Sequence, residues 1–412
     1  MQYVIHDQVI LSRAPEGPLA THLVPFADAL SAQGYSGQLL KVQVRIAACF
    51  SRWLKQKGVV GARNICLEHA TQYLRYRARH VRACLNDRAA LRHLIDFLRS
   101  EGVIPVEKTV TRRVPPTEVC AQAYAEYLRD AQALAGVTII NYVAFVRDFL
   151  HHCFGDGKVA LSRLRAADVV SFVQLNARRL HLKRAKLMTT ALRSFFRYAR
   201  YRGDVTLDLA AAVPVVANWS MPSIPRAISA DQTRQLLASI DRHTTVGRRN
   251  YAILLLLARL GLRAGEVAFL ELDDIDWRAG QLSVRGKSGQ RNELPLSAEV
   301  GKAIAAYLQH GRPPSASRRV FLSARAPIKG LGPVSVSSIV RRSLLGAGVD
   351  SPTTGAHQFR HGLATQMLSY GASLSEIGEV LGHRNPQTTQ IYSKVDIKAL
   401  RTLALPWPGG VR

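Results

Sequence analysis

The chain has 412 residues, which at roughly 150 residues per domain predicts two or three domains, and its 47% of hydrophobic residues excludes wholesale disorder. Lys and Arg number 56 against 29 Asp and Glu, a net charge of +27. Because such an excess destabilises a folded chain by self-repulsion, we expect a polyanionic partner, DNA or RNA, with an anionic membrane surface as the alternative. Residues 1–213 hold 31 basic and 16 acidic residues (+15) and residues 214–412 the remaining 25 and 13 (+12), so both halves are expected to face phosphates.

The sequence predicts neither a membrane span nor a secretion signal nor a disulfide framework. The longest apolar run, Tyr251–Ala258, stops at Arg259 and is far shorter than the roughly 20 residues that a span needs. Met1–Arg13 lacks the basic start of a signal peptide. The five cysteines are odd in number and without CxxC spacing, which favours free thiols in a reducing cytoplasm over disulfides or zinc. We therefore expect a cytoplasmic protein with no membrane partner.

Residues 1–104 are predicted to form an N-terminal helical domain, a candidate for DNA binding. Leu91–Ile104 resembles Leu192–Val205 at an offset of 101, and Arg45–Leu54 resembles Asn141–Leu150 at an offset of 96. All four segments have apolar residues at helical spacing with basic residues between them. Two interpretations stay open: one small helical DNA-binding module is duplicated, or amphipathic helices match by chance.

Two proline-bearing linkers, residues 105–117 and 214–226, enclose a second helical region at residues 118–213. Within it, Asn176–Arg202 holds nine basic residues, no acidic one, and four interleaved aromatic residues. A helix of this kind is expected to bury its aromatic residues and to offer its basic face to phosphates, with a merely solvated charged face as the alternative. We expect DNA contacts from five of the basic side chains: Arg178, Arg179, Lys183, Arg184 and Lys186.

The third region, residues 227–412, is predicted to be a further domain, mostly helical with one β-hairpin. In most of this region the apolar residues recur at helical spacing. In one short stretch, on both sides of a turn, apolar and polar residues instead alternate as in a strand. In chain order we expect an N-cap at Ser229, a helix over Arg249–Leu260 that ends at Gly261, a hairpin of Gln281–Arg285 and Glu293–Leu296 around a turn at Gly286–Asn292, and several helices within Ser335–Leu405.

Four motifs in this region carry side chains suited to chemistry on a phosphodiester. They are GLRAGE at Gly261–Glu266, GKSG at Gly286–Gly289, HQFRH at His357–His361, and LGH at Leu381–His383 followed by TTQIY at Thr388–Tyr392. Each alone has an ordinary structural interpretation, such as a surface ion pair of Arg263 with Glu266 or a core position for Tyr392. His357 and His361 are spaced to share a metal ion, but the Glu of an HExxH site is missing. Only the joint occurrence of the motifs points to one active site.

In this order and combination the motifs resemble those of the tyrosine recombinases, the phage integrase family of site-specific recombinases. The resemblance covers about residues 117–412, in which residues 118–213 are similar to the core-binding domain and residues 227–412 to the catalytic domain. It implies a mainly α fold: helical N-terminal and core-binding domains plus a mostly α catalytic domain with a small antiparallel β-sheet. Phe359 and Gly362 depart from the family's frequent Leu and Thr or Ser, and neither replaces a reacting group.

The residue types suggest how the phosphodiester is attacked. A tyrosine hydroxyl has a pKa of about 10, and a cationic pocket eases its ionisation, so Tyr392 is the expected nucleophile. Two planar guanidinium groups, those of Arg263 and Arg360, suit the non-bridging phosphate oxygens, where charge grows in the transition state. The resemblance implies a 3′-phosphotyrosyl link and a free 5′ hydroxyl, with no metal and no other cofactor.

The remaining groups are expected to handle protons and to support the arginines. Lys287, on the hairpin turn, is expected to protonate the leaving 5′ oxygen. His357 is expected to act as an acid or base, or as a hydrogen-bonding group, near the nucleophile, and His383 to donate a second hydrogen bond to the phosphate. Glu266 is interpreted as a structural partner for an arginine and His361 as a structural residue.

The resemblance implies double-stranded DNA with specific recombination sites as the partner, in a bacterial, nucleoid-associated setting. Residues 118–213 and 227–412 would clamp the duplex, and a homo-tetramer, with possible partner recombinases, would exchange strands through a Holliday junction. The tail Ser393–Leu405 is expected to dock either on a neighbouring protomer or on its own domain; both stay open.

Three rival functions remain: a catalytically silent DNA-binding protein on the same fold, a type IB topoisomerase-like relaxing enzyme, and a metal-dependent nuclease. The intact set of reacting residues argues against the first. Integration, transposition, resolution and inversion are not distinguished by the sequence, although the extra N-terminal region favours a mobile element.

Overall fold

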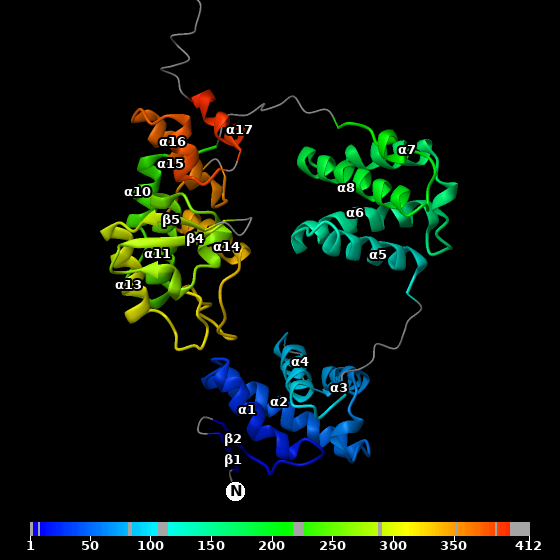
Figure 1. The fold of residues 1–412 in the computed structure, drawn as a ribbon. Coiled ribbons are helices and arrows are strands. Elements are labelled where there is room, and N and C mark those ends of the chain that lie inside the picture. Colours follow the sequence, from blue (N-terminus) through cyan, green and yellow to red (C-terminus); the bar gives the residue numbers. More distant parts are fainter. Residues whose placement is uncertain are drawn as a thin grey trace, which may run out of the picture. The chain divides into compact units, whose positions relative to one another are not determined.

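The computed structural model describes residues 3–6, 9–80, 85–105, 114–216, 226–286, 291–351, 353–383 and 385–395 (Figure 1). Contacts between Cα atoms divide the chain into two units, Met1–Val106 together with Ser223–Arg412, and Glu107–Pro222. Both units are mostly helical, and the first also holds two small antiparallel sheets of two and three strands. The mainly α fold class expected from the sequence is therefore confirmed. No helix among the described residues combines the length and apolar character that crossing a bilayer requires.

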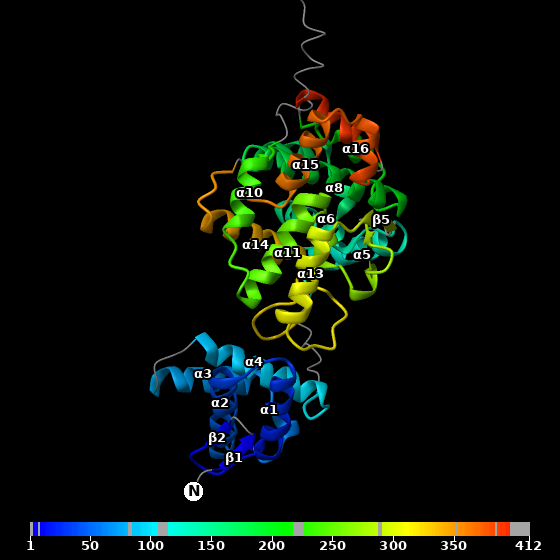
Figure 2. The same ribbon diagram turned by 90° about the vertical axis from the view of Figure 1, so that its left-hand side faces the viewer.

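The N-terminal part of the first unit is a helical bundle preceded by a short hairpin (Figure 2). Its elements are β1 (Tyr3–His6), β2 (Val9–Leu11), the 3-10 turn η1 (Ala20–His22), α1 (Leu23–Ala32), α2 (Gly37–Gln56), the 3-10 turn η2 (Ala62–Asn64), α3 (Leu67–His80) and α4 (Leu85–Ser100). The apolar stripes of these helices meet in one core, in which the rings of Phe50, Trp53 and Tyr73 lie with centroids 5.1–6.2 Å apart. Such aromatic pairs add to the free energy gained from burial alone.

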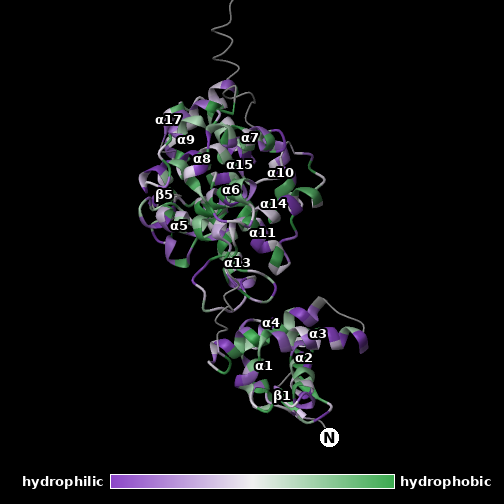
Figure 3. Ribbon diagram, turned by 90° about the vertical axis from the view of Figure 1, so that its right-hand side faces the viewer, coloured by the Kyte–Doolittle hydropathy of each residue, from purple (hydrophilic) through white to green (hydrophobic). Residues whose placement is uncertain are grey.

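The four longer helices of the second unit each carry both hydrophobic and hydrophilic residues (Figure 3). The elements of this unit are α5 (Pro116–Asp130), α6 (Gly136–Phe154), the 3-10 turn η3 (Leu161–Arg163), α7 (Ala166–Ala177), α8 (Leu182–Tyr201) and the short α9 (Leu209–Ala212). As expected, α8 buries Phe195, Phe196 and Tyr198 in the core. Tyr201 is 82% exposed, so the expectation that all four aromatic residues are buried is wrong for this one, which lies at the last position of the helix.

The C-terminal part of the first unit surrounds the buried helix α11. Its elements are α10 (Ala230–Ala238), α11 (Thr245–Leu260), α12 (Ala264–Ala268), η4 (Leu272–Asp274), β3 (Ile275–Asp276), β4 (Gln281–Arg285), β5 (Arg291–Pro295), α13 (Ala298–His310), α14 (Pro333–Gly346), α15 (His357–Ser369), α16 (Leu374–Val380), α17 (Pro386–Thr389) and η5 (Gln390–Val395). The run Ala252–Leu257 is buried on all sides, because α13 and α15 both pack against α11. The longest apolar run of the sequence, Tyr251–Ala258, thus belongs to a helix of the core.

Local signals in the sequence explain where several of these elements begin and end. Ser229 caps α10 as predicted: its hydroxyl accepts from the backbone N–H of Gln232, whose side chain bonds back to the Ser229 N–H. The predicted hairpin is confirmed as β4 paired with β5. The second strand begins at Arg291 rather than Glu293, because the ladder continues to the pair Arg285 and Arg291.

Candidate active site

Gly261 and Glu266 together fix the position of Arg263. Gly261 ends α11 in the left-handed conformation (φ 61°), and a Cβ at this position would meet side-chain carbons of Leu363 and Leu381 at 2.9 Å. Only glycine satisfies both demands. The chain then starts α12, where the Glu266 carboxylate accepts from the Arg263 backbone N–H at 2.7 Å and from its guanidinium at 2.6 Å. The structural role expected for Glu266 is therefore observed as direct contacts.

Arg360 links three motifs that are distant in the sequence. It lies on α15 and is only 4% exposed. Its guanidinium donates to the backbone carbonyl of Gly261 at 2.9 Å and to that of Leu381. Burial, and secondly the positive charge of Arg263, lowers the pKa of Arg360 to about 10, so the group stays cationic at neutral pH. The GLRAGE, HQFRH and LGH motifs therefore meet around this side chain.

Tyr392 lies in the 3-10 helix η5 and is 1% exposed, packed against Ile377 and Leu381. Its hydroxyl oxygen is 3.0 Å from Nδ1 of His361. Burial raises the pKa of Tyr392, while the positive charges of Arg360 and Arg263 act in the opposite direction. The phenol is therefore protonated at neutral pH, and its reaction as a nucleophile requires a group that accepts the proton.

The contact of Tyr392 with His361 differs from the sequence expectation. That expectation put His357 beside the nucleophile and gave His361 a structural role. The two histidines lie four residues apart on α15, with ring centroids 6.3 Å apart, so they share one face of the helix. The ring of His361, one turn further along, contacts the hydroxyl where η5 packs against α15. Residue spacing alone does not choose between two rings on the same face.

His383 follows Gly382, which adopts φ 59° and allows the His383 N–H to bond to the Gly378 carbonyl at 2.8 Å. Nδ1 of His383 is 2.8 Å from the hydroxyl oxygen of Thr389. Burial, followed by the charges of Arg360 and Arg263, lowers the pKa of His383 to about 4. His383 is therefore neutral at pH 7 and has one N–H to donate. Sequence reasoning missed Thr389, although it lies within the TTQIY motif.

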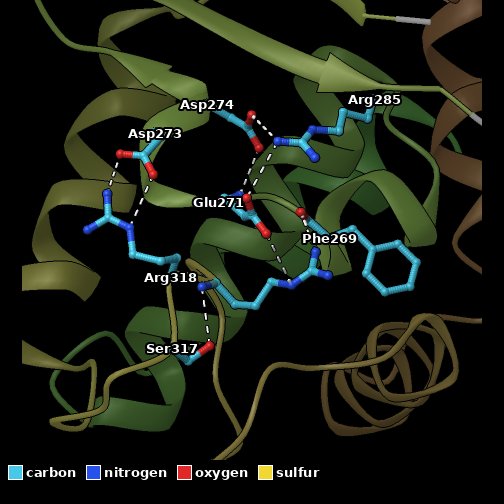
Figure 4. A network of polar contacts seen from close by, with 8 residues as sticks. Phe269, Glu271, Asp273, Asp274, Arg285, Ser317 and Arg318 are labelled. Carbon is cyan, nitrogen blue, oxygen red and sulfur yellow. Dashed lines mark hydrogen bonds and ion pairs between the residues drawn. The ribbon is translucent and has the colours of Figure 1, made fainter. Parts of the chain in front are cut away.

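Lys287 lies outside the described residues, but the strands on either side of its turn are described. Arg285, at the end of β4, lies 3.5 Å from a carboxylate oxygen of Glu271 and 3.6 Å from one of Asp274, whose side chain is 5% exposed (Figure 4). On β5, the amide of Asn292 lies so close to Gly382 that a Cβ there would meet it at 2.4 Å. The strand before the turn is thus held by ion pairs, and the strand after it lies against Gly382.

A cavity of about 550 Å³ opens beside these groups. Asn292, Gly382, His383 and Thr389 contribute to its lining. It provides space for a ligand next to the neutral imidazole. Within the described residues, no group of three or more His, Cys, Asp or Glu side chains is arranged to hold a metal ion.

Gly362 stands where the family frequently has Thr or Ser, and the structure gives a reason for the glycine. A Cβ at this position would lie 2.8 Å from the backbone carbonyl oxygen of Ile228, in the segment that leads into α10. The side chain of a Thr or Ser would therefore force α15 away from that segment. The departure at Phe359 is accommodated in the main core, where the ring is 1% exposed.

The five residues expected to contact DNA lie in the second unit, where α7 ends and α8 begins. Four of them are exposed and Lys186 is half-buried. The imidazole of His181 accepts from the Lys183 N–H and caps α8 between the two basic clusters. Arg184 also lies over the Phe145 ring, 5.0 Å from its centroid.

Comparisons with known proteins agree with this architecture. A model of the phage integrase family matches residues 226–398, and a model of the phage integrase N-terminal SAM-like domain matches residues 121–203. The putative integrase/recombinase y4rA of Sinorhizobium fredii is 60% identical over 410 residues, covering 99% of both chains. The tyrosine recombinase XerD of Mycobacterium tuberculosis (strain ATCC 25618 / H37Rv) is 31% identical over 307 residues, covering 70% of this chain and 96% of XerD.

Solved structures share the fold. XerH site-specific recombinase, in a post-cleavage complex with a palindromic difH substrate, matches with a TM-score of 0.57 and 20% identity over 70% of this chain and 84% of XerH. A lambda integrase (75–356) dimer bound to a COC′ core site matches with a TM-score of 0.53 and 17% identity over 66% and 94%. The chain belongs to the phage integrase family of tyrosine recombinases. It is a site-specific recombinase, an enzyme that cleaves and rejoins DNA strands.

Proposed function

We propose that Tyr392 attacks the phosphodiester and forms a 3′-phosphotyrosyl intermediate, leaving a free 5′ hydroxyl. The observation that carries this proposal is the position of Arg360, whose guanidinium contacts the Gly261 and Leu381 carbonyls. These contacts gather a buried tyrosine, two arginines and a neutral imidazole from segments spread over about 130 positions of the chain. The phosphoester link conserves the energy of the broken bond, so rejoining needs neither ATP nor a metal.

Arg263 and Arg360 bind the non-bridging oxygens of the phosphate, and His383 adds a neutral donor. Arg263 is oriented by Glu266 and Arg360 by two backbone carbonyls, so neither guanidinium needs to reorganise when charge develops. If the hydroxyl of Thr389 donates to Nδ1 of His383, the imidazole hydrogen lies on Nε2 and points to a different acceptor. We propose that this acceptor is a phosphate oxygen of the DNA.

Proton transfers occur on both sides of the phosphorus. His361 lies in hydrogen-bond contact with the Tyr392 hydroxyl and accepts its proton, and His357 on the same helix face assists. Lys287, on the hairpin turn between β4 and β5, protonates the leaving 5′ oxygen. The same groups act in reverse when the 5′ hydroxyl of a partner strand attacks the phosphotyrosine.

The partner is double-stranded DNA that carries specific recombination sites, bound by residues 118–213 and 227–412. Arg178, Arg179, Lys183, Arg184 and Lys186 supply backbone contacts. A tetramer exchanges strands through a Holliday junction, as the lambda integrase tetramer bound to a Holliday junction suggests by fold similarity. The bacterial nucleoid is the expected location, and further recombinases are expected partners.

The test is covalent capture on a nicked duplex. DNA from the ends of the genetic element that carries this gene is nicked beside the scissile phosphate, so that the leaving fragment diffuses away and the adduct accumulates. Denaturing gels should reveal a protein–DNA adduct in wild type, also in EDTA. Absence of any adduct would favour the silent DNA-binding protein, and dependence on a divalent ion would favour the nuclease. Exchange between two sites, rather than relaxation alone, separates a recombinase from a topoisomerase.

A further inference from the structure

Two four-helix segments, module 1 (residues 20–104) and module 2 (residues 116–205), repeat the same order of elements. Module 1 runs α1, α2, η2, α3, α4, and module 2 runs α5, α6, η3, α7, α8. In each, the fourth helix packs against the second. Three pairs of starting residues lie 99 positions apart: Gly37 of α2 and Gly136 of α6, Ala62 of η2 and Leu161 of η3, Leu67 of α3 and Ala166 of α7.

Burial follows the same register in both modules. Every buried residue of α6 lies 99 positions after a buried residue of α2, and five buried apolar residues of α8 lie 101 positions after buried apolar residues of α4. The pairs are Leu40/Ile139, Val44/Val143, Ile46/Phe145, Ala47/Val146, Phe50/Phe149 and Ser51/Leu150, and Ala90/Ala191, Leu91/Leu192, Leu94/Phe195, Ile95/Phe196 and Leu98/Ala199. Unrelated amphipathic helices share a period but have no reason to bury matching positions in two successive helix pairs.

The two modules also end in the same way. Gly102 and Gly203 both adopt the left-handed conformation, with φ 68° and 78°. The residue after each glycine donates its N–H to a carbonyl five positions back, at 2.9 Å in both cases. The next residues, Ile104 and Val205, are both buried. This is one helix-ending motif, repeated at the offset of 101.

The basic charge recurs at the same place in the fold. Module 1 holds 13 basic and 5 acidic residues (+8), and module 2 holds 14 and 7 (+7). In module 2, exposed basic residues cluster where the third helix ends and the fourth begins. In module 1 the last two turns of α3 and the first turn of α4 (the α3–α4 junction) carry exposed Arg75, Arg79 and Arg88. Within the described residues, none of these three forms an ion pair.

A part-buried ion pair links the two helices. Arg77 near the end of α3 donates to the carboxylate of Asp87 in the first turn of α4 at 2.9 Å, and the Asp87 side chain is 6% exposed. The pair therefore connects the last turn of α3 to the first turn of α4, close in sequence to the exposed arginines. One arginine at the junction thus has a structural task, while its exposed neighbours are available to an external anion.

We propose that module 1 is a second copy of the module that precedes the catalytic domain, and that its α3–α4 junction binds the phosphate backbone of duplex DNA. The matches to the family models begin at residue 121 and do not include module 1. The chain therefore holds its substrate with one DNA-binding module more than those models cover. The proposal rests on the proposed function of module 2 as a DNA-binding module. XerD of Mycobacterium tuberculosis matches along 96% of its own length while covering 70% of this chain.

The test uses the full-length protein and a fluorescein-labelled, mixed-sequence duplex several helical turns long. Affinity is measured by fluorescence anisotropy over a range of NaCl concentrations for the double variant Arg79→Gln, Arg88→Gln. The matched control is Lys57→Gln, Arg63→Gln, which removes the same charge from the segment between α2 and α3, about 20 Å from the C-terminal end of α3 for a helix of this length. All four side chains are exposed, so both variants should unfold at the wild-type temperature.

The junction variant should lose roughly tenfold or more in affinity at low salt, and the slope of log K against log[NaCl] should fall by about two. The control should keep the wild-type slope. Equal affinity and slope in the two variants would overturn the proposal. A wild type that forms no adduct would count against the proposed function and leave the affinity comparison intact.

Discussion

The active site and the basic helix junctions are expected to bind the same group, a DNA phosphate, in opposite ways. Arg360 is 4% exposed and anchored by two backbone carbonyls, whereas Arg178 and Arg79 are exposed side chains at the ends of helices. A buried, oriented guanidinium acts through geometry, because it needs no reorganisation in the transition state. An exposed one acts through charge and is screened by salt. Substitutions should therefore have abrupt effects in the first region and graded effects in the second.

The largest difference is expected for a substitution that keeps the charge. Arg360→Lys should slow adduct formation about a hundredfold or more, because lysine cannot replace the planar fork. Arg178→Lys should change it by no more than about twofold, since a phosphate contact there requires only a point charge. Single-turnover adduct formation on a nicked duplex measures both, with thermal unfolding as the check on folding. Similar rates for the two variants would remove the contrast between the regions.

A smaller effect is expected within the active site at the histidine pair. His361→Phe should slow adduct formation roughly ten- to a hundredfold, because it removes the hydrogen-bond partner of a buried hydroxyl. The pH dependence of the rate should change as well, which a purely structural role would not cause. His357→Phe is the matched variant on the same helix face. If only that variant alters the pH profile, His357 rather than His361 accepts the proton.

A few-fold effect is expected at the hairpin. Arg285→Ala should slow cleavage about threefold to fivefold, because the ion pairs that hold the strand before Lys287 are half-exposed. A substrate with sulfur at the bridging 5′ position has a leaving group that needs no protonation, so it should restore the rate. The control is Arg318→Ala, which breaks a neighbouring ion pair with Asp273 in the same network (Figure 4). A loss that sulfur does not restore would show that Arg285 acts elsewhere.

The smallest effect concerns stability. Because burial lowers the pKa of His383 to about 4, the folded protein resists protonation that the unfolded chain accepts near its ordinary value of about 6.5. The contribution of the neutral His383 to the free energy of unfolding is fully present above a pH of about 6.5 and is lost as the pH falls toward 4. The free energy of unfolding should therefore decline less steeply over this window in His383→Gln than in wild type. Denaturant titrations at several pH values measure the difference, and parallel curves would contradict the low pKa.

The sequence was enough to predict the helices, the hairpin and the motifs, because their signals are local. Ser229, Gly261 and the alternation around Gly286 each act on neighbouring residues. The contacts that position the side chains of the active site were not predictable. The carbonyls that hold Arg360 are backbone groups that no motif distinguishes, and the contact of Tyr392 depends on how η5 packs against α15.

The repeat shows the same limit. The match of Arg45–Leu54 with Asn141–Leu150 at an offset of 96 is three residues short of the offset of 99 that relates α2 to α6, both in their starts and in their buried positions. Three residues are nearly one helical turn, so a displaced amphipathic pattern still matches its copy. The sequence therefore detects the resemblance, while the register becomes visible only from the buried side chains.

The central claim is that the hydroxyl of Tyr392 becomes covalently joined to DNA in a pocket held together by Arg360. The most direct measurement is mass spectrometry of the peptide that remains attached to DNA after nuclease and protease digestion of the trapped adduct. We expect the nucleotide on Tyr392 in wild type, and in Tyr392→Phe full DNA binding without any adduct. A nucleotide on another residue, or an adduct that persists in Tyr392→Phe, would contradict the assignment.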